Sequence, residues 1–575
     1  MIRKTLSRLW VNLPSSRKYH IFYILILMMI ASIAELISIG MVVPFLGVLT
    51  QPEVLFSNPN LEGYFNYFNF TDPKQLLLPV TIIFSASAIL AGIIRLLLVI
   101  TQTRTGYLIG AEFGVEIYKR TLYQPYQKHM LTNTSEIIAG ISHKTTALVQ
   151  QGIIAILTII SSSLLLISIT TILIFINYKV ALTAFSLFGG IYLIIIISTR
   201  SILEAKGRLV TKMQNKVVQH IQEGLGGIRD ILIDNVQSVY ISSYKDSEFK
   251  LRNAQIIHTI FGTGPKFIIE ALGIASISLL AYLLLSDSSS STSAVPVLGA
   301  IALGAQRLLP ILQQIYASLS ALRAGQAALK DALDLLEQPL NEKLLYSEEI
   351  LFEDRIKIDN VSFSYTTESK NILDQTELII EKGTRIGLIG ETGSGKSTVL
   401  DILMGLLIPT RGFLYVDKKI ITDLNKHLWQ KLISHVPQSI FLSDSSIAEN
   451  IAFGVHKDDI DYKKIDEVLH LAQLTDTVNQ LPKNYYTIVG ERGVRLSGGQ
   501  KQRIGIARAL YKGAQVIIFD EATSALDSKT EEEVMKSIRN LPKELTMIIV
   551  AHRTSTLDDC DKIYKIENSK INTIK

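Results

Sequence analysis

Six long apolar runs, all before residue 317, constrain this chain of 575 residues more than any other feature. An α-helix rises about 1.5 Å per residue, so roughly 20 apolar residues are needed to cross a membrane. One run, from Gly152 to Ile176, contains no charged residue. The sequence therefore predicts six membrane-spanning helices, at 21–49, 78–101, 152–176, 180–199, 267–285 and 294–316.

The composition agrees with a membrane protein that also has a sizeable soluble part. Hydrophobic residues make up 48% of the chain and charged residues only 19%, whereas soluble proteins average about 25% charged residues. The net charge of +5 is small for this length and argues against a nucleic-acid partner. The single cysteine excludes a disulfide framework and a cysteine zinc cluster.

Basic residues beside the apolar runs predict the orientation of the helices. The segment before the first run is rich in Lys and Arg and has no acidic residue before Glu35, and the loops after the second and fourth runs are also basic. The opposite loops, 51–77, 177–179 and 287–293, hold few cations. Lys and Arg favour the cytoplasmic side, so we expect a multi-pass inner (plasma) membrane protein whose N-terminus and C-terminal half are cytoplasmic. The first run is too long for a cleaved signal peptide.

The two predicted cytoplasmic loops are long and have a helical pattern. We expect the membrane helices to continue into the cytoplasm, where short crosswise helices near 126–138 and 208–222 join them. The alternative is a pair of unrelated soluble loops.

The character of the sequence changes after Leu336. A Glu-Gln-Pro break and a charged segment follow, and short β-rich runs then alternate with helical stretches, which is typical of α/β nucleotide-binding domains. The sequence thus predicts an α-helical membrane domain over 1–336, a linker over 337–350 and an α/β P-loop ATPase domain over 351–575.

The most specific motif of the chain is a glycine-rich loop between an apolar strand and a helix. Residues 390–397, GETGSGKS, fit the pattern G-x-x-x-x-G-K-[ST]. Its backbone N–H groups can surround phosphate oxygens at a helix N-terminus. Lys396 is predicted to neutralise the β- and γ-phosphates of ATP, and the Ser397 hydroxyl to ligate Mg²⁺. The predicted ATP-binding loop comprises Gly390, Glu391, Thr392, Gly393, Ser394, Gly395, Lys396, Ser397 and Thr398.

Two further motifs complete the predicted ATPase site. The apolar run 516–519 leads to Asp520, a predicted magnesium ligand, and to Glu521, a predicted general base for the attacking water. A second glycine turn that opens a helix provides another anion cradle, which one domain hardly needs for one triphosphate. We therefore expect it to close on ATP held by a second copy of the chain; it comprises Leu496, Ser497, Gly498, Gly499 and Gln500.

Together these motifs resemble those of ATP-binding cassette (ABC) transporters, in the exporter arrangement with fused membrane and ATPase domains. The resemblance implies a homodimer with two ATP sites, and it implies that residues 490–493 contact the crosswise helices. It further implies that Tyr365 stacks on adenine and that Gln438 lies between magnesium, water and the membrane domain. By the same resemblance, Asp527 of the Ser-Ala-Leu-Asp loop crosses the dimer interface and His552 touches the γ-phosphate.

Cations within or directly beside the predicted spans bear on the substrate. Arg95, Lys266 and Arg307 each cost on the order of 3 kcal/mol in a membrane unless they are paired or face water. They are candidate ligands for an anionic lipid head group; the alternative is internal pairing with Glu35 and Glu270, or snorkelling of the side chains to the inner membrane surface.

Two other features of the membrane domain favour a lipid substrate. Gln306, Arg307, Gln313 and Gln314 share roughly one face of the last span, which suits a water-filled cavity or internal packing. Apolar residues at helical spacing over 61–68 predict a short amphipathic helix on the outer membrane surface. This combination is similar to the flippases of bacterial protein glycosylation, which move polyprenyl-pyrophosphate-linked oligosaccharides outward. A broad exporter of lipids or amphipathic drugs is the alternative if the cations are internally paired.

Overall fold

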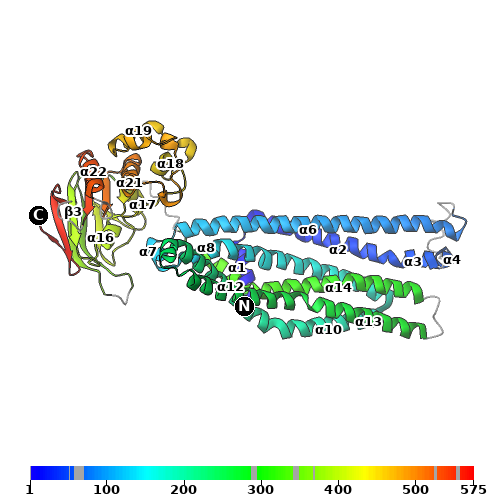
Figure 1. Ribbon diagram of the computed structural model, residues 1–575. Coiled ribbons are helices and arrows are strands. Elements are labelled where there is room, and N and C mark those ends of the chain that lie inside the picture. The colour runs from blue at the N-terminus through cyan, green and yellow to red at the C-terminus, as the bar shows by residue number, and fades with distance from the viewer. Residues whose placement is uncertain are drawn as a thin grey trace. The chain divides into compact units, whose positions relative to one another are not determined.

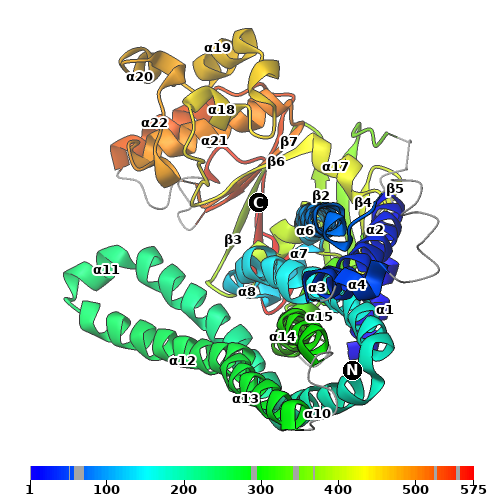
Figure 2. The same ribbon diagram turned by 90° about the vertical axis from the view of Figure 1, so that its right-hand side faces the viewer.

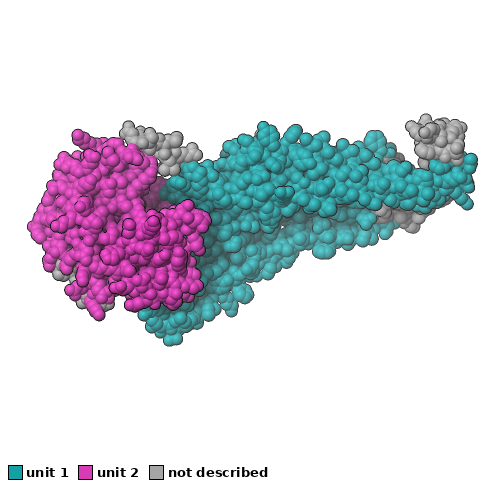
Figure 3. Space-filling model, turned by 90° about the horizontal axis from the view of Figure 1, so that it is seen from above, with its two compact units in different colours: residues 1–124, 132–340 teal, residues 125–131, 341–575 magenta. Residues whose placement is uncertain are grey.

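The computed structural model describes residues 2–50, 52–56, 70–286, 294–340, 349–366, 370–522, 528–551 and 557–575. Its internal contacts divide the chain into two compact units, which are coloured separately in Figure 3. One unit comprises residues 1–124 and 132–340, and the other comprises residues 125–131 and 341–575.

The first unit is built from long helices that lie side by side (Figure 1). The described residues of this unit contain no strand. Its helices are α1 (Ile2–Asn12), α2 (Ser15–Gly40), α3 (Val42–Thr50), α4 (Pro52–Phe56), η1 (Pro73–Leu76), α6 (Leu77–Leu122), α8 (Thr134–Ala139), η2 (Gly140–Lys144), α9 (Thr145–Ala147), η3 (Leu148–Ile154), α10 (Ala155–Gly226), α11 (Ile228–Ile233), α12 (Gln237–Thr263), α13 (Pro265–Ser286), α14 (Ala294–Ala324) and α15 (Gln326–Leu336).

Three helical segments of the described residues are long and apolar enough to cross a membrane. They are Ser15–Thr50, Pro73–Leu122 and Thr134–Phe175, and they overlap the first three predicted runs. The total of six spans stays a prediction. The predicted outer-surface helix over 61–68 lies outside the described residues.

Helix α10 folds back on itself, although its helical assignment is continuous over 72 residues. A Cβ atom on Gly207, in its second half, would collide with the backbone of Ala324. A Cβ atom on the next residue, Gly325, would collide with Gln151, which lies just before α10. A straight helix would separate residues 151 and 207 by about 84 Å. The two halves of α10 therefore return to the same level of the bundle, beside the junction of α14 and α15.

One of the two predicted crosswise helices is misplaced. After α6, the short helices α7 (Tyr126–Leu131) and α8 occupy the predicted region 126–138. The prediction for 208–222 is wrong, because these residues continue α10 without a break. Gly224, Gly226 and Gly227 come only later, and each glycine weakens a helix by about 1 kcal/mol relative to alanine. Accordingly α10 ends at Gly226, and the short helix that follows is α11 (Figure 2).

The second unit contains two sheets. A four-stranded antiparallel sheet has the order β2-β1-β4-β5, and a six-stranded sheet has the order β10-β9-β3-β8-β7-β6. In the larger sheet β9, β3, β8, β7 and β6 pair in parallel, as the alternation of strands and helices predicts. The strands are β1 (Arg355–Phe363), β2 (Leu373–Glu381), β3 (Arg385–Gly390), β4 (Arg411–Val416), β5 (Lys419–Ile421), β6 (Ile433–Val436), β7 (Val516–Asp520), β8 (Thr546–Val550), β9 (Lys562–Glu567) and β10 (Lys570–Thr573).

The central strands of the larger sheet are buried, and this limits where polar residues can lie in this unit. Alternate side chains of β7 enter two separate apolar cores, Ile517 and Phe519 one of them, Val516 and Ile518 the other. The first polar residue of β7 is therefore at its carboxyl end, where a parallel sheet exposes its ligand-binding edge. The helices are α7, α16 (Lys396–Leu403), α17 (Lys426–Leu432), α18 (Ile447–Ile451), η4 (Lys457–Asp459), α19 (Tyr462–Leu471), α20 (Thr475–Asn479), η5 (Asn484–Tyr486), η6 (Glu491–Gly493), α21 (Gly498–Lys512) and α22 (Ser528–Arg539).

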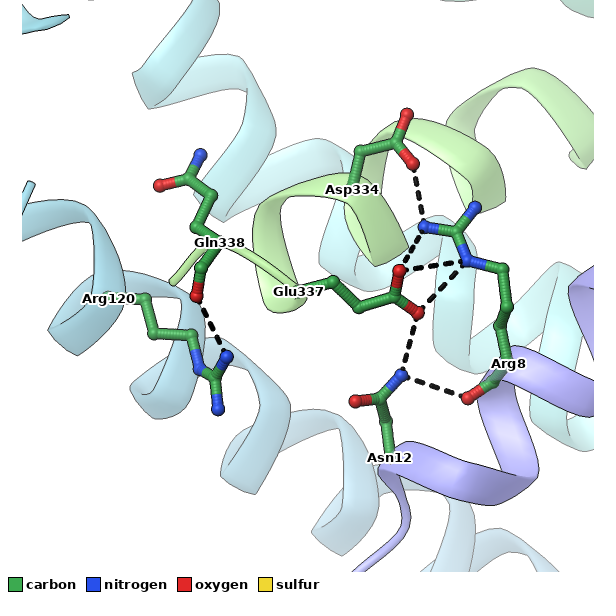
Figure 4. Close-up of polar contacts among 6 residues, drawn as sticks. All are labelled: Arg8, Asn12, Arg120, Asp334, Glu337 and Gln338. Carbon is green, nitrogen blue, oxygen red and sulfur yellow. Dashed lines mark hydrogen bonds and ion pairs between the residues drawn. The ribbon is translucent and has the colours of Figure 1, made fainter. Parts of the chain in front are cut away.

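A polar cluster fastens α1 to the end of α15 (Figure 4). The Arg8 guanidinium lies 2.7 Å from Asp334 and 2.7 Å from Glu337, and Asn12 donates a hydrogen bond of 2.9 Å to Glu337. Arg120 of α6 donates a hydrogen bond of 2.9 Å to the carbonyl of Gln338. The hydrogen bond from Arg8 lowers the pKa of the Glu337 carboxyl below its ordinary value. These contacts attach α1 and α6 to the C-terminal end of α15.

Replacing Arg8 should destabilise the helical unit modestly and in a pH-dependent way. We expect Arg8→Ala to lower the free energy of unfolding by about 1 kcal/mol at pH 7, since the pair is bidentate but partly exposed. The folded pKa of Glu337 lies below its ordinary 4.5, so this contribution is complete above that pH and disappears as the pH falls further. Thermal unfolding of the detergent-solubilised chain at several pH values measures it. Arg252→Ala is the control, because Arg252 pairs with Glu248 within one exposed helix; equal losses in both variants would contradict the prediction.

Candidate ATP-binding site

The glycine-rich loop connects the end of β3 to the start of α16. Gly393 and Gly395 have φ angles of +84° and +105°, which are strained for residues with a Cβ atom. The Lys396 ammonium donates hydrogen bonds of 2.8 Å and 3.1 Å to the carbonyls of Gly390 and Glu391. Lys396 is 7% exposed, so its charge is concentrated inside the loop. A buried cation and a helix N-terminus within a glycine loop can hold phosphate groups.

Asp520 lies at the carboxyl end of β7, as its sequence position predicts. Burial and the charge of Glu521 raise the pKa of Asp520, and the charge of Lys396 opposes this rise. The interaction shows that the strand motif and the glycine loop are close together. Two residues that the sequence analysis missed also face Asp520: Asp401 of α16, whose pKa is raised to about 6 by burial and by the Asp520 charge, and His435, at 3.9 Å. The signal for Asp401 was a single carboxylate within the otherwise apolar run 399–404.

The neighbouring carboxylates of Asp520, Glu521 and Asp401 together suit a divalent cation. A Mg²⁺ ion prefers hard oxygen ligands and is commonly held by one or two protein groups together with substrate phosphates. The Asp520 carboxylate and the Ser397 hydroxyl supply such oxygens. Among the residues that the structure describes, no group of three or more His, Cys, Asp or Glu side chains forms an all-protein metal site. The donor set fits a magnesium ion that arrives with a nucleotide.

Glu521 has a strained backbone. Its φ angle is +49°, in the left-handed region that residues with a side chain seldom adopt, and its N–H donates a hydrogen bond of 3.1 Å to the carbonyl of Val550. Such strain costs on the order of 1–3 kcal/mol and is found preferentially at functional sites. The bond to β8 fixes the turn that presents the Glu521 carboxylate next to Asp520.

Tyr365 lies beside the first turn of α16. Its hydroxyl is 3.2 Å from the Thr398 hydroxyl, and its ring makes an edge-to-face contact with Phe363 at 5.1 Å. This places an aromatic ring close to the phosphate-binding loop, where a base can stack on it.

The predicted second cradle forms the start of α21. Ser497 caps this helix by accepting a hydrogen bond from the Gln500 N–H, and the Gln500 side chain accepts one from the Ser497 N–H in return. A Cβ atom on Gly499 would collide with Thr530, so only glycine permits this close approach. Ser497 and Gly498 remain exposed. The cap fixes the direction of the exposed Ser497 side chain and of the Gly498 N–H group.

Comparison with known proteins agrees with this geometry. A family model described as ABC transporter matches residues 373–524. The ATP-dependent lipid A-core flippases of Paraburkholderia xenovorans (strain LB400) and Cupriavidus metallidurans (strain ATCC 43123) are 28% and 25% identical to this chain. Each alignment covers 84% of this chain and 82% of the relative, and therefore both units. The chain has an ABC transporter domain. It couples ATP hydrolysis to transport.

A solved structure shows the fold of the whole transporter. A bacterial Atm1-family ABC exporter with ATP bound superposes with a TM-score of 0.75 at 22% identity, over 96% of this chain and 94% of that chain. The transporter therefore has the fold of fused ABC exporters, with a helical membrane domain and an ABC ATPase domain.

Of the three remaining predicted site residues, the structure describes only Gln438. Gln438 is exposed, and its carbonyl accepts a hydrogen bond of 2.8 Å from the Gln502 side chain. Together with Arg492, Gly498 and Ala522 it lines a cleft of about 430 Å³. His552 and Asp527 lie outside the described residues.

Helix α7 contacts the ATPase domain at Tyr365. The Gln127 side chain donates a hydrogen bond of 2.8 Å to the Tyr365 carbonyl. Burial and the charge of Asp401 raise the pKa of Tyr126, the first residue of α7. The family resemblance implies that the crosswise helices contact residues 490–493; for α7, the structure shows a contact at the predicted adenine-stacking residue.

A covalent bond across this contact should arrest transport. We expect Gln127→Cys paired with Ser364→Cys to crosslink upon oxidation, in a Cys560→Ala background that removes the only native cysteine. The bond should block transport, because it would prevent α7 from moving on the ATPase domain. Gel mobility and transport measured before and after reduction test this. Gln127→Cys paired with Lys543→Cys is the control, since Lys543 lies beside Gly383, before β3 begins. Transport that continues through a complete crosslink would contradict the prediction.

The three membrane-domain cations have different surroundings. Arg307 forms an ion pair of 3.0 Å with Glu35, whose side chain is 5% exposed, while the Arg307 side chain is 47% exposed. Lys266 is exposed, with its ammonium 5.9 Å from the centre of the Phe267 ring, and within the described chain it forms no ion pair with Glu270. Arg95 is half-buried and has no ion pair with any described residue. Among the residues that the structure describes, internal pairing thus applies only to Arg307 of these three cations.

Proposed function

We propose that this ABC transporter works as a homodimer and moves a glycolipid with a phosphorylated head group from the inner to the outer leaflet. The specific substrate we propose is a polyprenyl-pyrophosphate-linked oligosaccharide. The single observation that carries the glycolipid class is the similarity, over both units, to relatives named as lipid A-core flippases. Six spans, an inner-membrane location and a cytoplasmic ATPase domain complete the proposal.

The homodimer is supported by the exposed cradle at the start of α21. The cleft at this cradle is lined by Gln438 and by Ala522, the neighbour of Glu521, but by no described residue of the 390–398 loop. A second copy could supply ATP to the exposed Ser497 hydroxyl and the Gly498 N–H group. Two ATP sites would then form between the two ATPase domains, and each would use residues of both copies.

Within each proposed site, different side chains would bind the phosphates, bind the magnesium ion and catalyse hydrolysis. We assign phosphate binding to Lys396 and the loop N–H groups, and magnesium binding to Ser397 and Asp520. The bound ion would supply positive charge to the phosphates. Glu521 would accept a proton from the attacking water, and Tyr365 would stack on the adenine. Gln438 and His552 are assigned to the water and the γ-phosphate by family resemblance.

The membrane-domain cations differ in how well they could bind a phosphorylated head group. Arg95 has no carboxylate partner among the described residues, and its guanidinium can grip a phosphate with two donors. The Arg307–Glu35 pair is neutral overall, so Arg307 contributes less attraction for an anion. This pair favours a second candidate function, a broad exporter of lipids or amphipathic drugs.

Lipid-stimulated ATP hydrolysis distinguishes the two candidate functions. The purified transporter in nanodiscs should be stimulated by a polyprenyl-pyrophosphate-linked oligosaccharide and less by the same polyprenyl chain as an alcohol. Lipid A-core should be tested in parallel, because the relatives are named for it. Equal stimulation by uncharged amphipathic drugs would favour the broad exporter.

A further inference from the structure

A polar cavity inside the helical unit is not explained by any of the motifs. It has a volume of about 410 Å³, and its lining comes from the segment 143–151, from α10 and α12, and from the junction of α14 and α15. Four glutamines, three threonines and two histidines provide its polar groups. The volume lies within the range of pockets that bind small molecules, roughly 300–1,000 Å³.

The cavity lacks charged side chains. Among the fourteen described residues that line it, none is Asp, Glu, Lys or Arg. The composition of this chain, 19% charged, would place about three charges among fourteen residues. Nearby charges have other partners, since Lys144 pairs with Asp331 at 3.0 Å and Arg252 with Glu248 at 2.7 Å. A cleft that merely faced solvent would not need to exclude charge in this way.

One lining side chain holds an unused hydrogen-bonding atom. The Nε2 atom of His258 is buried and has no hydrogen-bond partner among the described residues. Burial also lowers the pKa of His258, which keeps its imidazole neutral at pH 7. Buried polar atoms are nearly always paired, so this nitrogen, on a residue that lines the cavity, can take a further hydrogen-bond partner.

The walls of the cavity are held in place by close packing. Gly207 contacts the Ala324 backbone, and both residues line the cavity. Gln151 packs against Gly325, and Gln150 donates a hydrogen bond of 3.2 Å to the Tyr107 hydroxyl. Preformed walls of this kind lower the cost of ordering side chains around a ligand.

We propose that this cavity binds an uncharged, hydroxyl-rich group, namely a sugar in the head group of the exported lipid. Glutamine amides both donate and accept hydrogen bonds, and threonine hydroxyls and neutral imidazoles do so as well, which matches sugar hydroxyl groups. A phosphate would instead call for cations, and an apolar drug would leave these groups unpaired. The inference rests on the proposed function and deepens it, because it assigns the sugar and the phosphate to different residues.

The test compares lipids that differ only in their sugars. Purified full-length transporter in nanodiscs is titrated with polyprenyl pyrophosphate with and without an attached oligosaccharide, and separately with lipid A-core, and half-maximal stimulation of ATP hydrolysis is recorded. We expect wild type to prefer a glycosylated lipid, and the lipid that it prefers identifies the source of the sugar. Gln214→Leu on α10 and Gln255→Leu on α12 should each reduce this preference about tenfold, as the loss of a buried hydrogen bond does.

Two further variants sharpen the result. Gln219→Leu is the matched control, since Gln219 lies on α10 outside the cavity and pairs with Glu223, and it should keep the wild-type preference. Gln214→Glu should keep most of the preference, because a carboxylate still accepts hydrogen bonds from sugar hydroxyls but would repel a phosphate. The two leucine variants lie on different helices, so a folding defect in one leaves the other informative.

The outcomes separate this inference from the proposed function. If wild type prefers the glycosylated lipid and both leucine variants keep that preference, the cavity does not bind sugar and the proposed function stands. A Gln214→Glu variant that loses the response more completely than Gln214→Leu would show that the cavity faces phosphate, and would also overturn the inference. If no glycosylated lipid stimulates wild type more than its sugar-free counterpart, the inference and the oligosaccharide part of the proposed function both fail.

Discussion

Glu521→Gln is expected to lower ATP hydrolysis by at least about 100-fold while ATP still binds. The substitution keeps the shape of the side chain but removes the carboxylate that would accept a proton from the attacking water, and general-base catalysis contributes roughly 10²–10⁴-fold. Because hydrolysis stops after binding, the two ATPase domains should remain closed around the nucleotide. Phosphate release and the binding of a fluorescent ATP analogue, measured on the same preparation, record both effects.

A matched variant separates chemistry from folding in this experiment. Glu544→Gln makes the same change at an exposed position of the ATPase domain, away from the glycine loop, and should hydrolyse ATP at the wild-type rate. Near-normal hydrolysis by Glu521→Gln would show that the base lies elsewhere. The strained backbone at Glu521 would then need a purely structural explanation.

Arg95→Ala is expected to abolish the flipping of a pyrophosphate-linked lipid and to leave lipid-free ATP hydrolysis within a few-fold of wild type. A pyrophosphate carries about two or more negative charges and cannot cross hydrocarbon without compensation. In a homodimer Arg95 occurs twice, so two guanidinium groups could face the head group. Arg95→Lys keeps the charge but loses the two-pronged grip, and should therefore lose less activity than Arg95→Ala. Flipping is measured with a labelled lipid in proteoliposomes.

A different variant is needed to test Arg307, because this residue pairs with Glu35. Arg307→Ala would leave the buried Glu35 carboxylate unpaired, which costs about 3–5 kcal/mol, so loss of folded protein would hide any transport effect. The double variant Glu35→Gln/Arg307→Gln removes both charges together and should fold. If Arg307 also binds phosphate, this double variant should lose flipping; if it flips normally, Arg307 serves only the pair.

The control for both arginines is Arg104→Ala. Arg104 is exposed on the same helix as Arg95 but lies outside the predicted span, so its removal should not change flipping. Normal flipping by Arg95→Ala together with the double variant would show that the cations are structural, and the broad exporter would become the better description. Thermal stability of every variant must be measured beside transport.

The residues of the predicted ATPase site could be named from the sequence because its motifs are local. The spacing of Gly390, Lys396 and Ser397 is set within one strand-loop-helix unit, and Asp520 ends a strand whose burial is visible in its composition. The structure added what depends on tertiary contacts: the carboxylate of Asp401 facing Asp520, and the left-handed backbone of Glu521.

The membrane domain was harder to predict because its contacts join residues far apart in the chain. Glu35 and Arg307 are separated by more than 270 residues, and only the packed bundle brings them to 3.0 Å. The position of α11 was missed for a different reason. A helical pattern does not mark its own end, and the glycines at 224, 226 and 227 gave a better signal than the polar stretch before them.

Direct measurement of flipping tests the central claim, ATP-driven export of a phosphorylated glycolipid. The purified transporter is reconstituted into proteoliposomes with a labelled polyprenyl-pyrophosphate-linked oligosaccharide, and the label in each leaflet is followed by its access to an impermeant enzyme. We predict that ATP and Mg²⁺ move the lipid away from the leaflet that faces the ATPase domains, and that Glu521→Gln does not. Stimulated ATP hydrolysis with no net movement of this lipid or of lipid A-core, in the same vesicles that export a neutral amphipathic drug, would contradict the account.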